Sequence, residues 1–270
     1  MSVSRRWLSC ARGAYLLARG LKGVVARNDD RANVEGAFDV ADAAIALGLD
    51  RLMLERLGQD PHVSALMAAR YGLDYVFSKD ALAKCKPGSL GGVLFSTMAA
   101  GYDPDFYRRV SPSGEMTDYE WASHRGRQIH DLLHLVTGYP PTALGEIGVF
   151  AFLAGNALDY GCFFIASAAL IGRLLLRPKF LATEVSVFAR AWLAGRDAPA
   201  MLGVRFEERF DEDLFDLRVS LGIPRHGLSS VDFPEKLLKG YTFRELDGSA
   251  AVPRIALAAA RRGMRANAAA

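Results

Sequence analysis

Cysteine is scarce in this chain of 270 residues, and the pattern of the few cysteines excludes two common kinds of site. They lie far apart, at Cys10, Cys85 and Cys162. No Cys-x-x-Cys pair exists, so the sequence supports neither a disulfide framework nor a zinc site made of thiolates. A reducing compartment is the simpler interpretation, and any metal site must use histidine and carboxylate ligands.

A marked excess of one charge is also lacking. The 33 basic and 30 acidic residues leave a formal net charge of only +3. The basic side chains are scattered and do not interleave with aromatic residues, so we expect no nucleic-acid partner. Because 51% of the residues are hydrophobic and 23% are charged, the chain can bury a substantial core.

Few segments alternate between apolar and polar residues, which argues against β-strands. Apolar residues instead recur at helical spacing between glycine and proline stops. We therefore predict an all-α fold, with a single helical domain over residues 29–225. A basic amphipathic helix over residues 1–28 is expected to precede it. Residues 226–270 are expected to form a C-terminal extension. Its apolar residues follow no clear helical spacing, which is typical of a mobile tail.

The first 28 residues contain no acidic side chain, and their apolar residues share one face of a helical wheel. Three interpretations remain open for this segment. It is an ordinary surface helix of the domain, a helix that lies on an anionic membrane surface, or a cleaved organellar targeting segment. Charges interrupt every apolar stretch, which excludes a secretory signal.

The chain is strongly apolar from Leu144 to Leu176. A stretch of this length could cross a membrane. Glu146 and Asp159 would then lie in or beside the span, where carboxylates are costly. We therefore favour one or two buried helices that line an apolar, lipid-binding tunnel.

Two of the five histidines, His130 and His134, lie four residues apart on a helix predicted from about residue 118 to Val136. Both imidazoles then leave the same helix face. Asp131 lies within a quarter turn of that face. Glu146 follows on the next predicted helix and can return alongside the histidines if the two helices pack antiparallel.

Imidazole and carboxylate ligands suit zinc, iron, cobalt or manganese, and such a set leaves open positions for a substrate. Simpler roles stay open, since a histidine can cap a helix and Asp131 can pair with Arg127. A metallopeptidase of the His-Glu-x-x-His type is not expected, because Asp131 occupies the glutamate position. A phosphohydrolase with an adjacent His-Asp pair would leave His134 unexplained.

The run His130-Asp131-x-x-His134, followed after eleven residues by Glu146, resembles the signature of the coenzyme Q (ubiquinone) biosynthesis protein four family. Flanking segments resemble the family too: Arg125-x-Arg127-Gln128, Leu135-Val136-Thr137-Gly138-Tyr139, Lys86-Pro87-Gly88-Ser89-Leu90-Gly91, Trp192-Leu193-Ala194-Gly195 and residues 217–223. The resemblance spans roughly residues 10–225.

The resemblance implies a helical protein that binds a metal, usually assigned as zinc, through His130, Asp131, His134 and Glu146. It also implies a metal-dependent carboxy-lyase that removes the C1 carboxylate of a polyprenylated hydroxybenzoate and replaces it oxidatively by hydroxyl. From the chemistry of the side chains we hypothesise that Arg125 or Arg127 pairs with that carboxylate, whose shape matches a guanidinium; the alternative is that both are surface residues. The alternative function is a non-catalytic scaffold that binds prenyl lipid and organises the other enzymes of the pathway.

The resemblance further implies a peripheral membrane protein. It would lie on the cytoplasmic face in a bacterium, and on the matrix side of the inner mitochondrial membrane in a eukaryote. The expected partners are a polyprenylated aromatic substrate, a membrane surface and other ubiquinone-biosynthesis enzymes. The sequence leaves open whether the chain forms a homo-oligomer.

Overall fold

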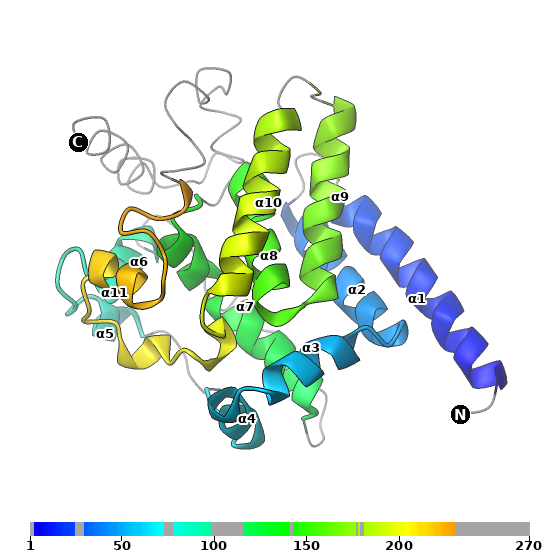
Figure 1. Ribbon diagram of the computed structural model, residues 1–270, viewed down its shortest axis with the longest axis horizontal. Coiled ribbons are helices and arrows are strands. Elements are labelled where there is room, and N and C mark those ends of the chain that lie inside the picture. The colour runs from blue at the N-terminus through cyan, green and yellow to red at the C-terminus, as the bar shows by residue number, and fades with distance from the viewer. Residues whose placement is uncertain are drawn as a thin grey trace.

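A computed structural model describes residues 3–24, 30–72, 78–98, 116–140, 143–176, 178 and 181–229 (Figure 1). Every regular element in these ranges is a helix, and the one β pairing among them is an isolated bridge between Ser89 and Asp213. The all-α prediction is therefore confirmed for this part of the chain. The predicted C-terminal extension lies outside the described residues from position 230 on, so its boundary and that of the N-terminal helix stay predictions.

Helix α8 lies in the middle of the molecule (Figure 1). In chain order the helices are α1 (Val3–Val24), α2 (Asp30–Ala46), α3 (Asp50–Gly58), α4 (Pro61–Ala68), α5 (Lys79–Leu82), α6 (Leu90–Met98), α7 (Asp118–Thr137), α8 (Ala143–Ala157), α9 (Tyr160–Leu176), α10 (Leu181–Asp197), the 3-10 helices η3 (Met201–Gly203) and η4 (Phe206–Glu208), and α11 (Leu214–Ser220).

Local signals set both ends of α7, close to the predicted bounds. The Thr117 side chain accepts a hydrogen bond from the backbone of Glu120, and the Glu120 carboxylate accepts one from the backbone of Thr117. This capping box satisfies donors that have no partner inside the helix. Gly138 ends the helix in the left-handed conformation, with φ of 77°. The pair Asp60-Pro61 predicts another helix start, and the Asp60 side chain indeed accepts hydrogen bonds from the first backbone N–H groups of α4, with Pro61 at the first helical position.

The long apolar segment is divided between α8 and α9. Leu158 adopts a positive φ of 54° between them, and the Asp159 carboxylate accepts a hydrogen bond from the backbone of Cys162. Asp159 therefore caps α9, and two helices form, as predicted. Across the described parts of the chain, no helix combines the length and hydropathy that a membrane crossing requires. The apolar tunnel stays a prediction.

Glycine allows α8 and α10 to approach very closely. A Cβ atom on Gly155 would lie 2.1 Å from the carbonyl oxygen of Trp192, and one on Gly195 would lie 2.0 Å from that of Phe152. No side chain fits between backbones at this separation. Nearly every residue of α8 is buried, so this helix is the central element of the core.

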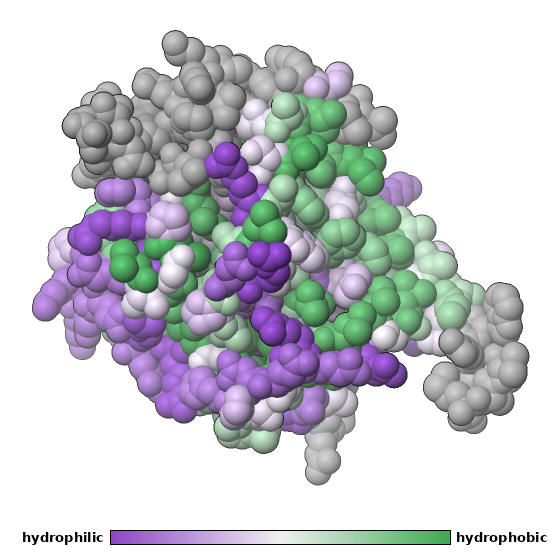
Figure 2. Space-filling model, viewed as in Figure 1, coloured by the Kyte–Doolittle hydropathy of each residue, from purple (hydrophilic) through white to green (hydrophobic). Residues whose placement is uncertain are grey.

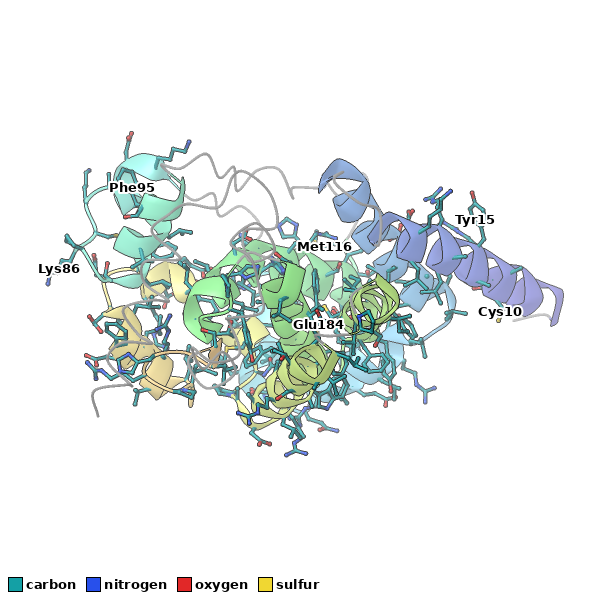
Figure 3. All side chains as sticks on the ribbon, turned by 90° about the horizontal axis from the view of Figure 1, so that it is seen from above. Cys10, Tyr15, Lys86, Phe95, Met116 and Glu184 are labelled. Carbon is teal, nitrogen blue, oxygen red and sulfur yellow. The ribbon has the colours of Figure 1, made fainter. Side chains whose placement is uncertain are left out.

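The N-terminal helix α1 packs along α2 at one edge of the molecule. A Cβ atom on Gly13 would meet Leu47, and one on Gly20 would meet the carbonyl oxygen of Gly36, so the two helices run antiparallel. Figure 3 shows Cys10 and Tyr15 of α1 at the opposite end of the molecule from Lys86 and Phe95. This packing favours the interpretation of α1 as a surface helix of the domain.

The sequence pattern also predicts continuous helix over residues 180–224, ended by Pro224, and this prediction is wrong between α10 and α11. Pro199 lacks a backbone N–H, and the Asn156 amide donates to the Pro199 carbonyl while its oxygen accepts from the backbone of Met201. The chain is thus bent by bonds to α8. Four apolar side chains in this region have helical spacing, which predicts that they belong to the core, and all of them are buried: Phe206, Phe210, Leu214 and Leu217.

We expect Gly155→Ala to lower the free energy of unfolding by about 1–3 kcal/mol, because the added methyl group forces α8 and α10 apart. Thermal unfolding followed by circular dichroism measures this. The control is Gly58→Ala, since a Cβ there meets no atom within 4 Å and alanine favours the helix. An equal fall of the melting temperature in both variants would contradict the tight packing.

Candidate metal centre

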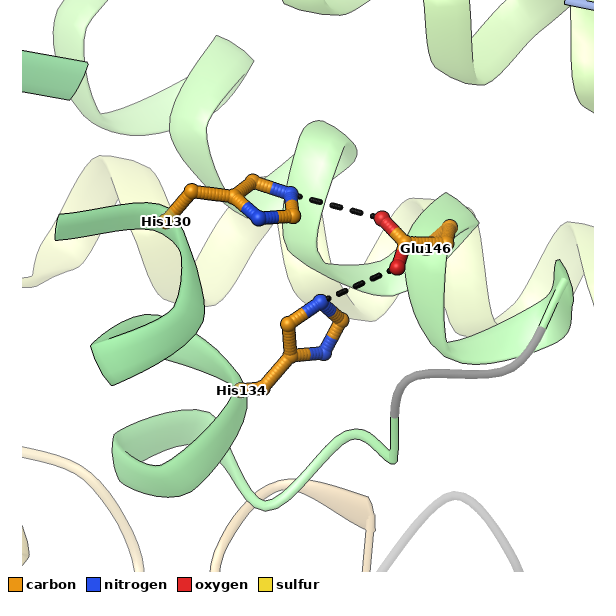
Figure 4. A group of neighbouring side chains, drawn as sticks. All are labelled: His130, His134 and Glu146. Carbon is orange, nitrogen blue, oxygen red and sulfur yellow. Dashed lines mark ion pairs between the residues drawn. The ribbon is translucent and has the colours of Figure 1, made fainter. Parts of the chain in front are cut away.

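Two imidazoles of α7 face one carboxylate of α8 (Figure 4). The Nε2 atom of His130 lies 3.3 Å from Oε2 of Glu146, and the Nε2 atom of His134 lies 3.1 Å from Oε1. Each carboxylate oxygen of Glu146 therefore contacts a different imidazole ring. These three side chains, which we call the triad, come from helices that are consecutive in the chain, as predicted.

Local contacts orient both rings. The Nδ1 atom of His134 donates a hydrogen bond to the backbone carbonyl of Tyr139, at 2.9 Å, which leaves Nε2 free of a proton in the neutral ring. The ring of His130 lies against Phe150, with the two ring centres 5.0 Å apart. Phe150 stands one helical turn after Glu146, so spacing on α8 alone could have indicated it.

The triad fits a divalent metal ion. One ligand atom from each side chain lies within 4.8 Å of the other two. Zinc binds nitrogen and oxygen at about 2.0–2.2 Å in a tetrahedron, so two of its ligands stand about 3.4 Å apart. The two observed contacts, at 3.3 and 3.1 Å, match that separation. Three ligands leave a fourth position for a substrate, and the donor set is equally suited to iron, cobalt or manganese.

Charges in the triad depend strongly on one another. Burial lowers the pKa of His134, but the charge and hydrogen bond of Glu146, the Asp131 carboxylate and the Tyr139 carbonyl together outweigh burial and raise it to about 9. Burial raises the pKa of Glu146, but the two imidazoles outweigh this effect and hold it well below its usual range. The Glu146 side chain is 36% exposed, whereas the Nε2 atoms of both histidines are buried. A bound cation would take the place of the proton that the imidazole and the carboxylate attract.

Asp131 stands apart from the triad. Its Oδ1 atom lies 3.3 Å from Nδ1 of His130, the ring nitrogen on the other side from the one that faces Glu146. Burial raises the pKa of Asp131 to about 7. In this arrangement the carboxyl group orients the His130 ring. Its predicted role as a fourth ligand stays a prediction.

The two predicted substrate-binding arginines have partners within the protein. Arg125 is only 2% exposed, and its guanidinium forms a bidentate ion pair with Glu207 at 3.1 and 3.0 Å. Arg127 donates to the Ser123 hydroxyl at 3.1 Å. Substrate binding by Arg125 would require it to give up the ion pair, so Arg127 is the more accessible of the two. Both roles stay predictions.

The fold and this site define a class: an all-helical protein with a two-histidine, one-carboxylate centre on two consecutive helices. A family model described as "Coenzyme Q (ubiquinone) biosynthesis protein Coq4" matches residues 39–226. The match covers more than half of the sequence, so the chain belongs to the Coq4 family.

Curated relatives and a solved structure agree with this. A mitochondrial COQ4 homolog of Rattus norvegicus is 28% identical over 219 residues, which are 78% of this chain and 79% of the relative. The Bos taurus homolog is 38% identical over 101 residues, 37% of each chain. The crystal structure of a Nostoc punctiforme protein assigned to ubiquinone biosynthesis aligns with a TM-score of 0.67 at 24% identity. The alignment covers 78% of this chain and 97% of the Nostoc protein, so the two proteins share a fold.

We expect His134→Ala to lose most of the bound metal and to keep its helical content, because one of three ligands is removed from a preformed site. Elemental analysis of the purified protein measures the metal, and far-ultraviolet circular dichroism measures the helix. The control His62→Ala removes a histidine whose Nε2 contacts the Gly203 carbonyl instead. Equal metal in the His134 variant and the parent would remove His134 from the site.

Proposed function

We propose that the protein is a metal-dependent carboxy-lyase of ubiquinone biosynthesis. Its substrate would be a polyprenylated hydroxybenzoate, whose C1 carboxylate is replaced by hydroxyl. The observation that carries this proposal is the convergence of His130, His134 and Glu146 at 3.1–3.3 Å in a member of the Coq4 family. Other enzymes of the pathway would supply the substrate and take up the product.

The residues of the centre fit an anionic aromatic substrate. A divalent metal held by the triad would supply a Lewis acid for a carboxylate or phenolate oxygen. Phe150, packed against His130, offers an apolar surface beside the metal position on which an aromatic ring can lie. Glu146 is the most exposed side chain of the triad, so the substrate would enter from its side.

The overall reaction needs an oxidant. Loss of the carboxylate as carbon dioxide and gain of a hydroxyl group at the same carbon remove two electrons from the substrate. An oxidant such as molecular oxygen has to accept these electrons. Zinc undergoes no redox change, whereas iron and manganese do, so the identity of the metal bears directly on where the oxidant reacts.

The helices behind the centre suit an isoprenoid tail. Phe163 of α9 contacts both Phe188 and Trp192 of α10, with ring centres 6.0 and 5.4 Å apart. These helices and α8 are rich in apolar residues, and we propose that the prenyl tail of the substrate lies among them. Side-chain packing there would have to open, because the tail needs a continuous apolar path.

A second candidate function is a non-catalytic scaffold that binds prenyl lipid and other ubiquinone-pathway enzymes. The exposed surface favours it. Hydrophobic residues gather over α9 and part of α10, although hydrophilic ones also lie along α10 and line the lower edge of the view in Figure 2. Ile171, Val185 and Leu193 are among the large apolar side chains exposed on these two helices. Such a surface fits peripheral contact with a membrane or with another protein.

Removal of the metal separates the two candidates. We expect purified protein to convert a short-chain prenylated hydroxybenzoate under air. A chelator should abolish the conversion, because it removes the metal ion that would bind the carboxylate of the substrate. Added metal should restore it, and mass spectrometry of the quinol product measures it. Conversion that is unchanged by complete metal removal would exclude the metal-dependent enzyme. Prenyl lipid that co-purifies with an inactive protein would support the scaffold.

Membrane contact is tested by flotation with liposomes that contain anionic lipid. We expect the protein to float at low salt and to be released by carbonate, as a peripheral protein is. Ile171→Glu should weaken flotation, because it places a charge on the apolar surface of α9. The control is Val219→Glu on α11, since Val219 and Ile171 are both 56% exposed. Equal flotation of both variants and the parent would remove this surface from membrane contact.

A further inference from the structure

Every backbone carbonyl from Leu133 to Tyr139, at the end of α7, has a hydrogen-bond partner. The last carbonyls of a helix lack partners inside the helix, so each needs another donor. The Leu133 carbonyl accepts from the Thr137 hydroxyl at 2.6 Å, and the His134 carbonyl accepts from the backbone of Gly138 at 3.0 Å. The next four carbonyls bind donors from a distant part of the chain.

Arg218 of α11 binds two of these carbonyls. Its Nη2 atom donates to Leu135 at 2.6 Å, and its Nε atom donates to Val136 at 3.0 Å. The side chain is largely buried, and this burial lowers the pKa of Arg218 to about 10. A cation at a helix C-terminus meets the negative end of the helix dipole. The carbonyl groups of α7 thus stabilise the buried guanidinium, and the guanidinium holds the end of α7.

The segment that follows α11 binds the next two carbonyls. The backbone N–H of Leu228 donates to Thr137 at 2.6 Å, and the Ser229 hydroxyl donates to Gly138 at 2.6 Å. Two glycines with positive φ allow this approach, since a Cβ atom on Gly227 would lie 2.8 Å from the Thr137 carbonyl oxygen. The two backbones are therefore in direct contact.

The turn held in this way carries the carbonyl that orients His134. The Tyr139 carbonyl accepts from Nδ1 of His134, and Nε2 consequently faces Glu146. A shift of the turn would move this acceptor and free the imidazole to rotate. Groups that orient metal-ligating histidines typically affect metal affinity by about 10–100-fold when they are removed.

We propose that Arg218 and Ser229 are positioning residues of the metal centre, which hold the end of α7 so that His134 presents Nε2 to the metal. The proposal rests on the proposed function, because it assumes a metal at the triad. It extends the site to a segment more than 80 residues further along the chain, which acts through the backbone of α7.

The test compares Arg218→Met and Ser229→Ala with matched controls. Arg209→Met removes an arginine that pairs with Glu212 and Ser220 inside its own segment, and Ser220→Ala removes a similar hydroxyl. Zinc affinity is measured by competition with a coloured chelator, at a temperature where circular dichroism shows each variant folded. We expect about 10–100-fold weaker binding for Arg218→Met and a smaller loss for Ser229→Ala. The controls should bind as the parent does, and Arg218→Lys should recover part of the loss.

Two further readouts separate positioning from general stability. The visible spectrum of the cobalt-substituted protein should change in Arg218→Met and not in the control Arg209→Met, because it reports the ligand geometry. Hydrogen exchange of residues 134–139 in the metal-free protein should be faster in both test variants. If Arg218→Met does not fold, Ser229→Ala provides the result.

The outcomes are distinct for the two proposals. Lower melting temperatures with parent-like zinc affinity, cobalt spectrum and hydrogen exchange would overturn the positioning role alone. A parent protein that binds no metal would overturn the proposed function and the metal part of this proposal together. Faster exchange at the end of α7 with weaker zinc binding would support both.

Discussion

The contact between one carboxylate and two imidazoles is the interaction on which the rest of this site depends. Glu146 can reach His130 and His134 only because α7 ends abruptly and α8 begins a few residues later. An ordinary helix end would leave carbonyl groups without partners in a buried place. Here Gly138 adopts the left-handed conformation and turns the chain, and the Ser229 hydroxyl donates a hydrogen bond to the Gly138 carbonyl.

The core around α8 makes this arrangement rigid. The helix is buried along nearly its whole length, and its glycine contact with α10 prevents it from sliding or tilting without a clash. A ligand at the start of such a helix has little freedom, which suits a centre that must hold three donors about one ion. Elsewhere on α7, a buried charge is likewise balanced inside the protein by the ion pair between Arg125 and Glu207.

Much of the fold follows from local chemistry that the sequence displays openly. The capping box at Thr117, the glycine stop at Gly138 and the Asp60-Pro61 start each depend on residues within four positions of one another. The region between α10 and α11 shows the opposite case. Phe206 and Phe210 have helical spacing and are buried, yet the chain there is irregular because an amide on α8 binds its backbone. Helical spacing of apolar residues predicts which side chains are buried. It does not predict which backbone groups form hydrogen bonds with distant segments.

The sequence by itself determined the helical class, the family and the two histidines on one helix face, because these depend on composition and on spacing along a single helix. Only the tertiary structure decided which nitrogen of each ring faces Glu146, that Asp131 lies beside the opposite nitrogen, and that Arg125 is bound by Glu207. It also brought Arg218 to the end of α7. Most of these contacts join residues about 80 positions apart, or depend on the rotation of a side chain, and no local pattern encodes either.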